Sequence, residues 1–213
     1  MTDQAYREQL VELGASLFNR GYSVGSGGNI SLKLPDGNFL FTPTNSSLGR
    51  LKADELSLVD PEGNHLGGHK PTKEIPMHMG VYEARPDCNA IVHLHSTYAT
   101  AYSSIAGLDP TDAFTPFTPY FVMKVGKLLV APYYKPGSPM LKQAARDAGL
   151  KASAFLLANH GAVVCGGSLI EAANAAEELE ETMKLYFLLM SSNQSIRYLT
   201  SEEISELTQA KAP

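Results

Sequence analysis

The segment Ala90-Ile91-Val92-His93-Leu94-His95 decides how this chain folds and where its chemistry lies. A short apolar run of this kind is typical of a strand inside a sheet. Side chains two positions apart on a strand point to the same face, so we expect His93 and His95 to project side by side. Two neighbouring imidazoles provide half of a site for a divalent transition metal. Taken alone, the pair also fits two histidines at the edge of a core.

The surrounding sequence alternates between helical and strand patterns. Ser168 and Glu171 form a capping box at the start of the best-marked helix, and Thr200 with Glu203 forms another. No linker, repeat or low-complexity tract interrupts the pattern, which predicts one domain, residues 1–213, with helices on a mixed sheet. We expect helices at 3–20, 72–85, 139–149, 169–191 and after Thr200, and strands at 30–33, 38–42, 56–59, 90–95, 128–130 and 154–158.

The composition indicates a cytoplasmic globular protein. The 213 residues are 44% apolar and 18% charged, which is enough to bury a sizeable core. The formal net charge is -5 and no basic run is present, so nucleic acid is not an expected partner. No apolar stretch approaches the roughly 20 residues of a membrane span, and the amino terminus carries no secretion signal. Cys88 and Cys165 are expected to be buried free thiols.

Two further residues complete a candidate metal site. His160 directly follows the apolar strand at 154–158, where side chains of α/β folds often face a cleft. Glu74 lies near the start of the helix expected from Thr72, a position that favours a carboxylate. Three histidines and a carboxylate match catalytic zinc sites, which keep an exchangeable position for water or substrate. His78, one helical turn after Glu74, is expected to be structural or to support a ligand.

The glycine-rich loop Gly25-Ser26-Gly27-Gly28-Asn29 suggests a phosphate site. Closely spaced backbone N–H groups, together with the Ser26 and Asn29 side chains, can cradle phosphate, although a flexible turn has the same composition. The loop lacks the patterns of nucleotide P-loops and of dinucleotide-binding turns, so ATP and NAD are not expected. Further donors are expected from two later segments, the second of which opens a helix. These donors are Thr44, Asn45, Thr72 and Lys73.

Five motifs occur in a fixed order along nearly the full chain. They are Gly25-Ser26-Gly27-Gly28-Asn29-Ile30-Ser31, Thr42-Pro43-Thr44, Lys70-Pro71-Thr72-Lys73-Glu74, His93-Leu94-His95-Ser96 and Asn159-His160-Gly161. In this order they resemble the class II aldolase/adducin-head superfamily. The resemblance implies an α/β/α sandwich around a mainly antiparallel sheet, and a homotetramer with active sites between subunits. It implies zinc ligands at Glu74, His93, His95 and His160, and phosphate contacts at Ser26, Gly28, Asn29, Thr44, Asn45, Thr72 and Lys73.

Two central segments narrow the resemblance. Residues 116–124 and 132–137 are similar to the 3-oxo-tetronate 4-phosphate decarboxylases, lyases of four-carbon sugar-acid breakdown. The similarity implies a zinc-dependent reaction that converts a phosphorylated β-keto acid into dihydroxyacetone phosphate and CO2. It also implies that Tyr120 is a proton donor, often across a subunit boundary, beside Glu74 as the acid/base. How the two residues divide the proton transfer stays open.

Three other functions remain alternatives. Class II sugar-phosphate aldolases of the fuculose-phosphate type use related chemistry, but Lys73 and Asn45 stand where those enzymes commonly have serine and glycine. A superfamily epimerase or dehydratase is a second alternative, although the epimerases commonly carry aspartate where this chain has Glu74. A non-catalytic adducin-head-like module is the third. Such modules lack a complete metal set, whereas this chain has every expected ligand.

Overall fold

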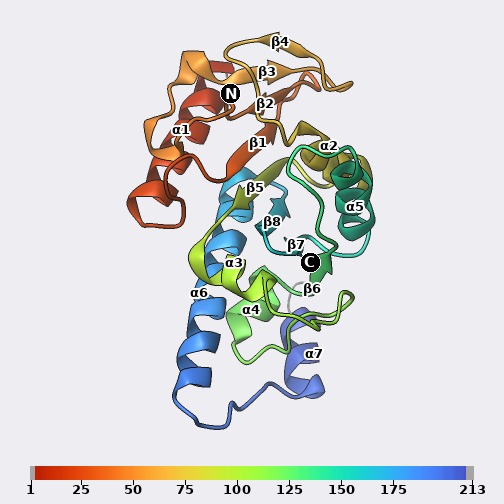
Figure 1. Cartoon of the computed structure of the whole chain (residues 1–213). Helices are drawn as coiled ribbons and strands as arrows, with labels where there is room; N and C mark the ends of the chain where they lie inside the picture. Colours follow the sequence, from red (N-terminus) through yellow and green to blue (C-terminus); the bar gives the residue numbers. More distant parts are fainter. Residues whose placement is uncertain (1–2, 210–213) are drawn as a thin grey trace.

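A mixed sheet organises the computed structural model, which describes residues 3–209 (Figure 1). Within these residues eight strands pair in the order β4-β3-β2-β1-β5-β8-β7-β6, and all neighbours except β6 and β7 are antiparallel. The α/β fold with a mainly antiparallel sheet is therefore confirmed. The strands are β1 Asn29–Lys33, β2 Phe39–Phe41, β3 Ser57–Val59, β4 His65–Gly67, β5 Ala90–Leu94, β6 Leu128–Ala131, β7 Ala154–Leu157 and β8 Gly161–Gly166.

Helices cover both faces of the sheet. Figure 1 shows α1 and α6 on one side of the central strands and α2 and α5 on the other. Each side has its own buried apolar cluster. The helices are α1 Asp3–Asn19, α2 Ile75–Ala84, α3 Thr97–Ser103, α4 Pro119–Lys124, α5 Met140–Gly149, α6 Leu169–Ser191 and α7 Ser201–Gln209, with short 3-10 turns at Leu48–Arg50 and Ala53–Glu55.

The alternation of side chains along β1 and β5 separates packing from chemistry. Ile30 and Val92 belong to the apolar cluster under α1 and α6. Their neighbours point to the opposite face, because successive side chains alternate across a strand. Asn29 therefore lies on the α2 side, where it pairs in register with His93. Polar groups of both strands are thus brought together beneath the start of α2.

Most predicted elements form close to the expected limits. Both capping boxes are present: the Ser168 Oγ accepts from the Glu171 N–H at 3.2 Å, and the Thr200 Oγ1 accepts from the Glu203 N–H at 3.3 Å. The expected cap at Thr72 is wrong. The helix begins at Ile75 with Glu74 as its N-cap residue, because the chain turns inward at Glu74 before the helix starts.

Four elements were not expected from the sequence. These are β4, β8, α3 and α4. Strand β8 begins directly after the turn at His160, so the sequence pattern does not separate its apolar run, Ala162 to Cys165, from that turn. Helix α4 starts with Pro119 inside a proline-rich segment, where proline is tolerated because the first turn needs no N–H donor.

Two smaller expectations can be compared with the structure. Cys88 and Cys165 are buried free thiols, as predicted. None of the helices formed by residues 3–209 is long and apolar enough to cross a membrane.

Candidate metal centre

His93 is the most deeply placed member of the site. It lies on the fully buried strand β5, between Asn29 of β1 and Val163 of β8. Its Nδ1 lies 2.8 Å from the carbonyl oxygen of Ala162 and donates to it. That bond fixes the tautomer and leaves the Nε2 lone pair available for a metal.

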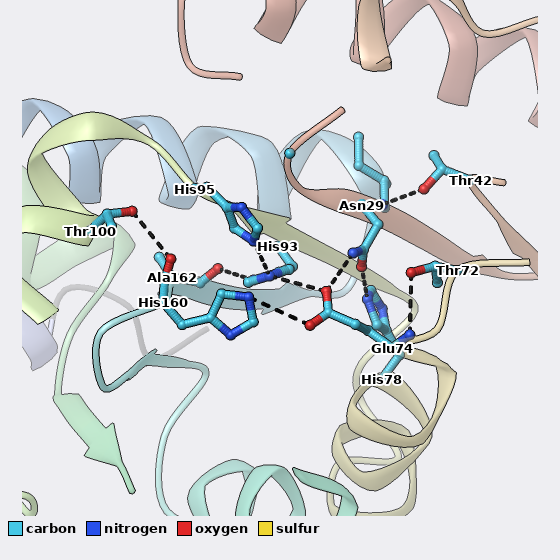
Figure 2. A network of polar contacts seen from close by, with 12 residues as sticks. Asn29, Thr42, Thr72, Glu74, His78, His93, His95, Thr100, His160 and Ala162 are labelled. Carbon is cyan, nitrogen blue, oxygen red and sulfur yellow. Dashed lines mark hydrogen bonds and ion pairs between the residues drawn. The ribbon is translucent and has the colours of Figure 1, made fainter. Parts of the chain in front are cut away.

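His95 and His160 reach the same point from different elements. His95 directly follows β5, and His160 closes the turn between β7 and β8, where its N–H donates to the Leu157 carbonyl at 3.0 Å. The three imidazole centroids are 4.7, 4.8 and 4.9 Å apart (Figure 2). The Nε2 atoms of His93 and His95 are separated by 3.0 Å. The rings therefore converge on one small volume, as the HxH pattern and His160 predicted.

Two glycines allow the backbone to pack against the end of β5. A Cβ on Gly28 would lie 2.7 Å from the His93 carbonyl oxygen, and one on Gly161 would lie 2.3 Å from that of Leu94. Both residues also have positive φ, 79° and 156°. Any other residue would push the glycine-rich loop or the β7–β8 turn away from the histidines. Gly28 therefore contributes to the site by letting its backbone lie close to the His93 carbonyl.

Glu74 brings the carboxylate to the histidines from the N-cap of α2. Its Oε2 lies 3.3 Å from His93 Nε2, and its Oε1 lies 3.6 Å from His160 Nε2. The Oε2 also accepts a hydrogen bond from Asn29 Nδ2 at 2.7 Å. The Oε1 is buried without a hydrogen-bond partner in the described structure. A buried carboxylate oxygen of this kind requires a compensating partner, and a cation supplies one.

The spacing of the four side chains fits a metal ion. One ligand atom from each of Glu74, His93, His95 and His160 lies within 4.8 Å of the others. Ligand atoms about 2.0–2.1 Å from a tetrahedral zinc lie roughly 3.3–3.4 Å from one another. The observed separations of 3.0, 3.3 and 3.6 Å bracket that value. The residues present could therefore hold a divalent metal ion, with the expected ligand composition.

The charge states of the metal-free site also suit a cation. Burial lowers the pKa of His95 to about 4, and the charges of His93 and His160 add to the effect. Burial and His93 lower the pKa of His160 to about 4 as well. Burial alone would raise the pKa of Glu74, but its contacts with His93 and the hydrogen bond from Asn29 outweigh it and bring the pKa well below its usual range. At neutral pH the site therefore offers a carboxylate and the neutral imidazoles of His95 and His160.

Residues predicted to contact phosphate occupy neighbouring segments. The 42–44 and 70–72 segments lie side by side, because the Thr44 N–H donates to Lys70 at 2.9 Å and the Thr72 N–H donates to Thr42 at 3.3 Å. Thr72 is buried, and its Oγ1 accepts from the Glu74 N–H at 3.2 Å. Thr44 and Asn45 line a cavity of about 380 Å³. Its lining also includes both basic and acidic side chains, among them Arg50, Lys52, Glu55 and Lys70.

The remaining predicted phosphate contacts differ in their exposure to solvent. Ser26 lies exposed in the loop before β1, and Lys73 is exposed next to the loop that carries Gly137. Asn29 is buried and already engaged, since its amide contacts both Glu74 and His78. One N–H of its amide group is left for a ligand, because an amide nitrogen carries two donors.

Tyr120 lies apart from this polar network. It is on α4 with 60% of its surface exposed, and within residues 3–209 its hydroxyl forms no hydrogen bond to the four candidate ligands.

Sequence reasoning missed one residue that supports the site. Glu180 of α6 is buried and accepts hydrogen bonds at the start of α3, directly after His95. The donors are the Ser96 hydroxyl at 2.7 Å and the N–H groups of Tyr98 at 2.9 Å and Ala99 at 2.7 Å. A charged residue inside the otherwise apolar stripe of 169–191 was the available signal, because buried carboxylates need donors.

The fold and the four-residue centre define the class of this protein. The chain belongs to the Class II Aldolase and Adducin N-terminal domain family, whose pattern it matches over residues 8–187. A 3-oxo-tetronate 4-phosphate decarboxylase from Haemophilus influenzae is 55% identical over 207 residues, which cover 97% of this chain and 98% of that protein. The resemblance seen in the motifs, including the narrower one to this branch, is thereby confirmed.

Two further relatives bear on the structure and on the alternatives. The crystal structure of YgbL from Klebsiella pneumoniae superposes with a TM-score of 0.94 at 55% identity, covering 97% of this chain and 99% of that one. An L-fuculose phosphate aldolase from Methanocaldococcus jannaschii is 40% identical over 182 residues, which cover 85% of this chain and 96% of that protein.

Proposed function

We propose that this chain is a zinc-dependent carboxy-lyase that converts a 3-oxo-tetronate 4-phosphate into dihydroxyacetone phosphate and CO2. The observation that carries the proposal is the convergence of Glu74, His93, His95 and His160 on one point. The decarboxylase from Haemophilus influenzae, 55% identical over almost the whole chain, supports the choice of reaction. The proposal treats residues 1–213 as one catalytic domain that acts in the cytoplasm during four-carbon sugar-acid breakdown.

The substrate decides what the site has to do. Breaking the bond between C1 and C2 releases CO2 and leaves an electron pair that moves toward the C3 ketone, giving an enediolate. A zinc ion held by the four ligands supplies a Lewis acid for the developing negative charge. Protonation of C2 then gives dihydroxyacetone phosphate.

Glu74 and Tyr120 are assigned to the proton transfer. Glu74 is held at the site by Asn29 and next to His93, so its carboxyl group can exchange a proton with a substrate bound there. Tyr120 is exposed on α4, as a residue that completes a neighbouring subunit's site would be. We therefore include a homotetramer with active sites between subunits in the proposal.

The phosphate is assigned to the glycine-rich loop and the paired segments beside it. The glycines let the loop at Ser26, Gly28 and Asn29 pack closely against the end of β5, so its backbone N–H groups lie near the histidines. Thr44, Asn45, Thr72 and Lys73 contribute donors and one positive charge. The adjacent cavity is lined by Arg50 and Lys70, which favour an anion, and by Lys52, whose charge is paired with Glu55.

A class II sugar-phosphate aldolase is the second candidate. The observation in its favour is the 40% identity to an L-fuculose phosphate aldolase. Both reactions leave the same enediolate of dihydroxyacetone phosphate, and only the departing fragment differs. CO2 leaves in one reaction and an aldehyde in the other.

The deciding experiment supplies purified zinc-loaded protein with four-carbon 3-oxo-acid 4-phosphates and, separately, with ketose 1-phosphates. CO2 release and dihydroxyacetone phosphate are measured in the first assay, and aldehyde release in the second. We expect turnover of the oxo-acid only, and Tyr120→Phe should slow it while zinc content and KM are kept. Cleavage of the ketose phosphates without CO2 release would assign the protein to the aldolases instead.

A further inference from the structure

A chain of hydrogen bonds connects the Glu74 carboxylate to the interior behind it (Figure 2). His78 lies one turn after Glu74 on α2 and is fully buried. Its Nε2 is 2.5 Å from the Asn29 Oδ1, and its Nδ1 is 2.7 Å from the Ser31 hydroxyl oxygen. That hydroxyl is in turn 2.8 Å from the Tyr82 hydroxyl. The chain ends at Glu74, whose Oε2 accepts from the Asn29 amide.

The periodicities of two elements bring these groups into one row. Asn29 and Ser31 are two apart on β1 and therefore face the same side of the sheet. His78 and Tyr82 are four apart on α2 and therefore share one helix face, which also contains the N-cap residue Glu74. Packing of this face onto β1 places donors opposite acceptors along the whole row.

The direction of each hydrogen bond follows from chemistry. The Asn29 Oδ1 can only accept, so the Nε2–H of His78 donates to it. A neutral imidazole then has an acceptor at Nδ1, which takes the proton of the Ser31 hydroxyl. The Ser31 oxygen accepts from Tyr82. Every hydrogen bond in the row is therefore donated in the direction of the Glu74 carboxylate.

This direction decides how Asn29 meets Glu74. The amide of an asparagine can rotate by about half a turn and exchange its oxygen and nitrogen. The rotated form would place Oδ1 against the Glu74 Oε2, and two acceptors repel. Because the Glu74 carboxylate can only accept, it takes Nδ2, and Oδ1 then faces His78. The Nε2–H of His78 donates to Oδ1 and so holds the amide in this orientation.

We propose that His78 is a positioning residue of the metal centre, which fixes the Glu74 carboxylate by holding the Asn29 amide. With Oε2 fixed in this way, Oε1 is directed toward His160 and the volume between the histidines. The inference rests on the metal centre of the proposed function but not on the identity of the substrate. It predicts that His78 influences the metal through Glu74 alone.

The test measures zinc affinity by competition with a chelator, so no substrate is needed. His78→Leu removes the donor to Asn29, and we expect zinc to bind about 10- to 100-fold more weakly, the usual effect of losing support behind a ligand. His78→Gln keeps an N–H close to the position of Nε2 and should restore most of the affinity. In a Glu74→Ala background, His78→Leu should cause no further loss.

The background comparison separates positioning from general structural support. An equal loss of affinity with and without Glu74 would show that His78 only stabilises the fold and would overturn the proposal, as would unchanged affinity in His78→Leu. If His78→Leu does not fold, Ser31→Ala replaces it, since that change removes one hydroxyl and leaves His78 without its second partner. The same Glu74-dependent loss is then expected, in smaller degree, and its absence again overturns the proposal.

The result is distinguishable from failure of the proposed reaction. Wild-type protein that binds zinc but releases no CO2 would overturn the decarboxylase proposal and leave the affinity comparison valid. Wild-type protein that binds no zinc would overturn both.

Discussion

Successive side chains of β1 and β5 point to opposite faces of the sheet, and the two faces differ in their chemistry. On the α1–α6 side, Ile30 and Val92 join a continuous apolar cluster. On the α2 side, Asn29 and His93 contact Glu74 directly, next to the second apolar cluster to which Ile91 of β5 belongs. The comparison shows that one face is apolar along both strands, while the other combines apolar packing with partly compensated polar groups at the end of β5. Changes on the two faces should therefore have separable effects.

The largest effect is expected from His93→Ala. His93 is fully buried and central among the ligands, so its loss removes a zinc ligand and the imidazole next to the Glu74 Oε2. We expect the purified variant to lose most of the approximately one zinc per chain expected for a catalytic site, and turnover with it. Metal analysis and activity assays measure both quantities. His95→Ala and His160→Ala should behave similarly, and full zinc content in all three variants would remove the assigned centre.

A smaller change on the same face should separate proton transfer from metal binding. Glu74→Gln is nearly isosteric and leaves three imidazoles, so we expect most of the zinc to remain. Turnover should fall by roughly 10²–10⁴, the usual contribution of a positioned acid or base. Metal content and kcat are measured on the same preparation. Near-normal turnover would contradict the acid/base role of Glu74 and leave the metal site in place.

How far the sequence predicted this arrangement depends on the range of the interactions. His93 and His95 could be assigned to one face because a strand has a period of two, and the observed strand β5 confirms the assignment. The partners of Glu74 could not be derived in that way. Asn29 was predicted as a phosphate contact, and its hydrogen bond to a residue 45 positions away depends on how α2 packs on β1.

The misplaced start of α2 has a similar cause. Thr72 has the right side chain for an N-cap, but its Oγ1 is engaged two residues before the helix, and the chain does not become helical until Ile75. Glu180 also depended on tertiary structure, since its donors belong to a helix about 80 residues away, at Ser96 and beyond. Local patterns therefore identified the ligands, while packing decided which residues support them.

The pH dependence of the metal-free protein should come from the polar face. The unfolded chain takes up protons on histidine near the ordinary pKa of about 6.5. In the folded metal-free protein the pKa of His95 and of His160 is about 4, and burial lowers the pKa of His78 to about 3. Between these values the unfolded state binds more protons. Stability is therefore fully present above pH 6.5 and falls as the pH decreases toward 4.

Urea unfolding of chelator-treated protein between pH 7.5 and 4.5 measures this effect. Each such histidine contributes at most about 1.4 kcal/mol per pH unit to the decrease in the free energy of unfolding. The matched variant His95→Gln has one fewer titrating group and should show a shallower decrease. Identical pH profiles for the two proteins would mean that the pKa of His95 is the same in the folded and unfolded states, and would contradict the prediction.

The smallest effect is expected from the apolar face, at Ile30→Val. Ile30 is fully buried between two polar neighbours of the opposite face, and the change removes one methylene group under α1 and α6. Large-to-small changes of this type cost about 0.5–1.5 kcal/mol in the free energy of unfolding. Zinc content, kcat and KM should remain at wild-type values, because the side chain points away from Asn29 and His93. Thermal or urea unfolding together with the zinc assay measures the separation between the faces. Loss of zinc in this variant would show that the α1–α6 side also determines the geometry of the metal centre, and that the two faces of β1 do not act independently.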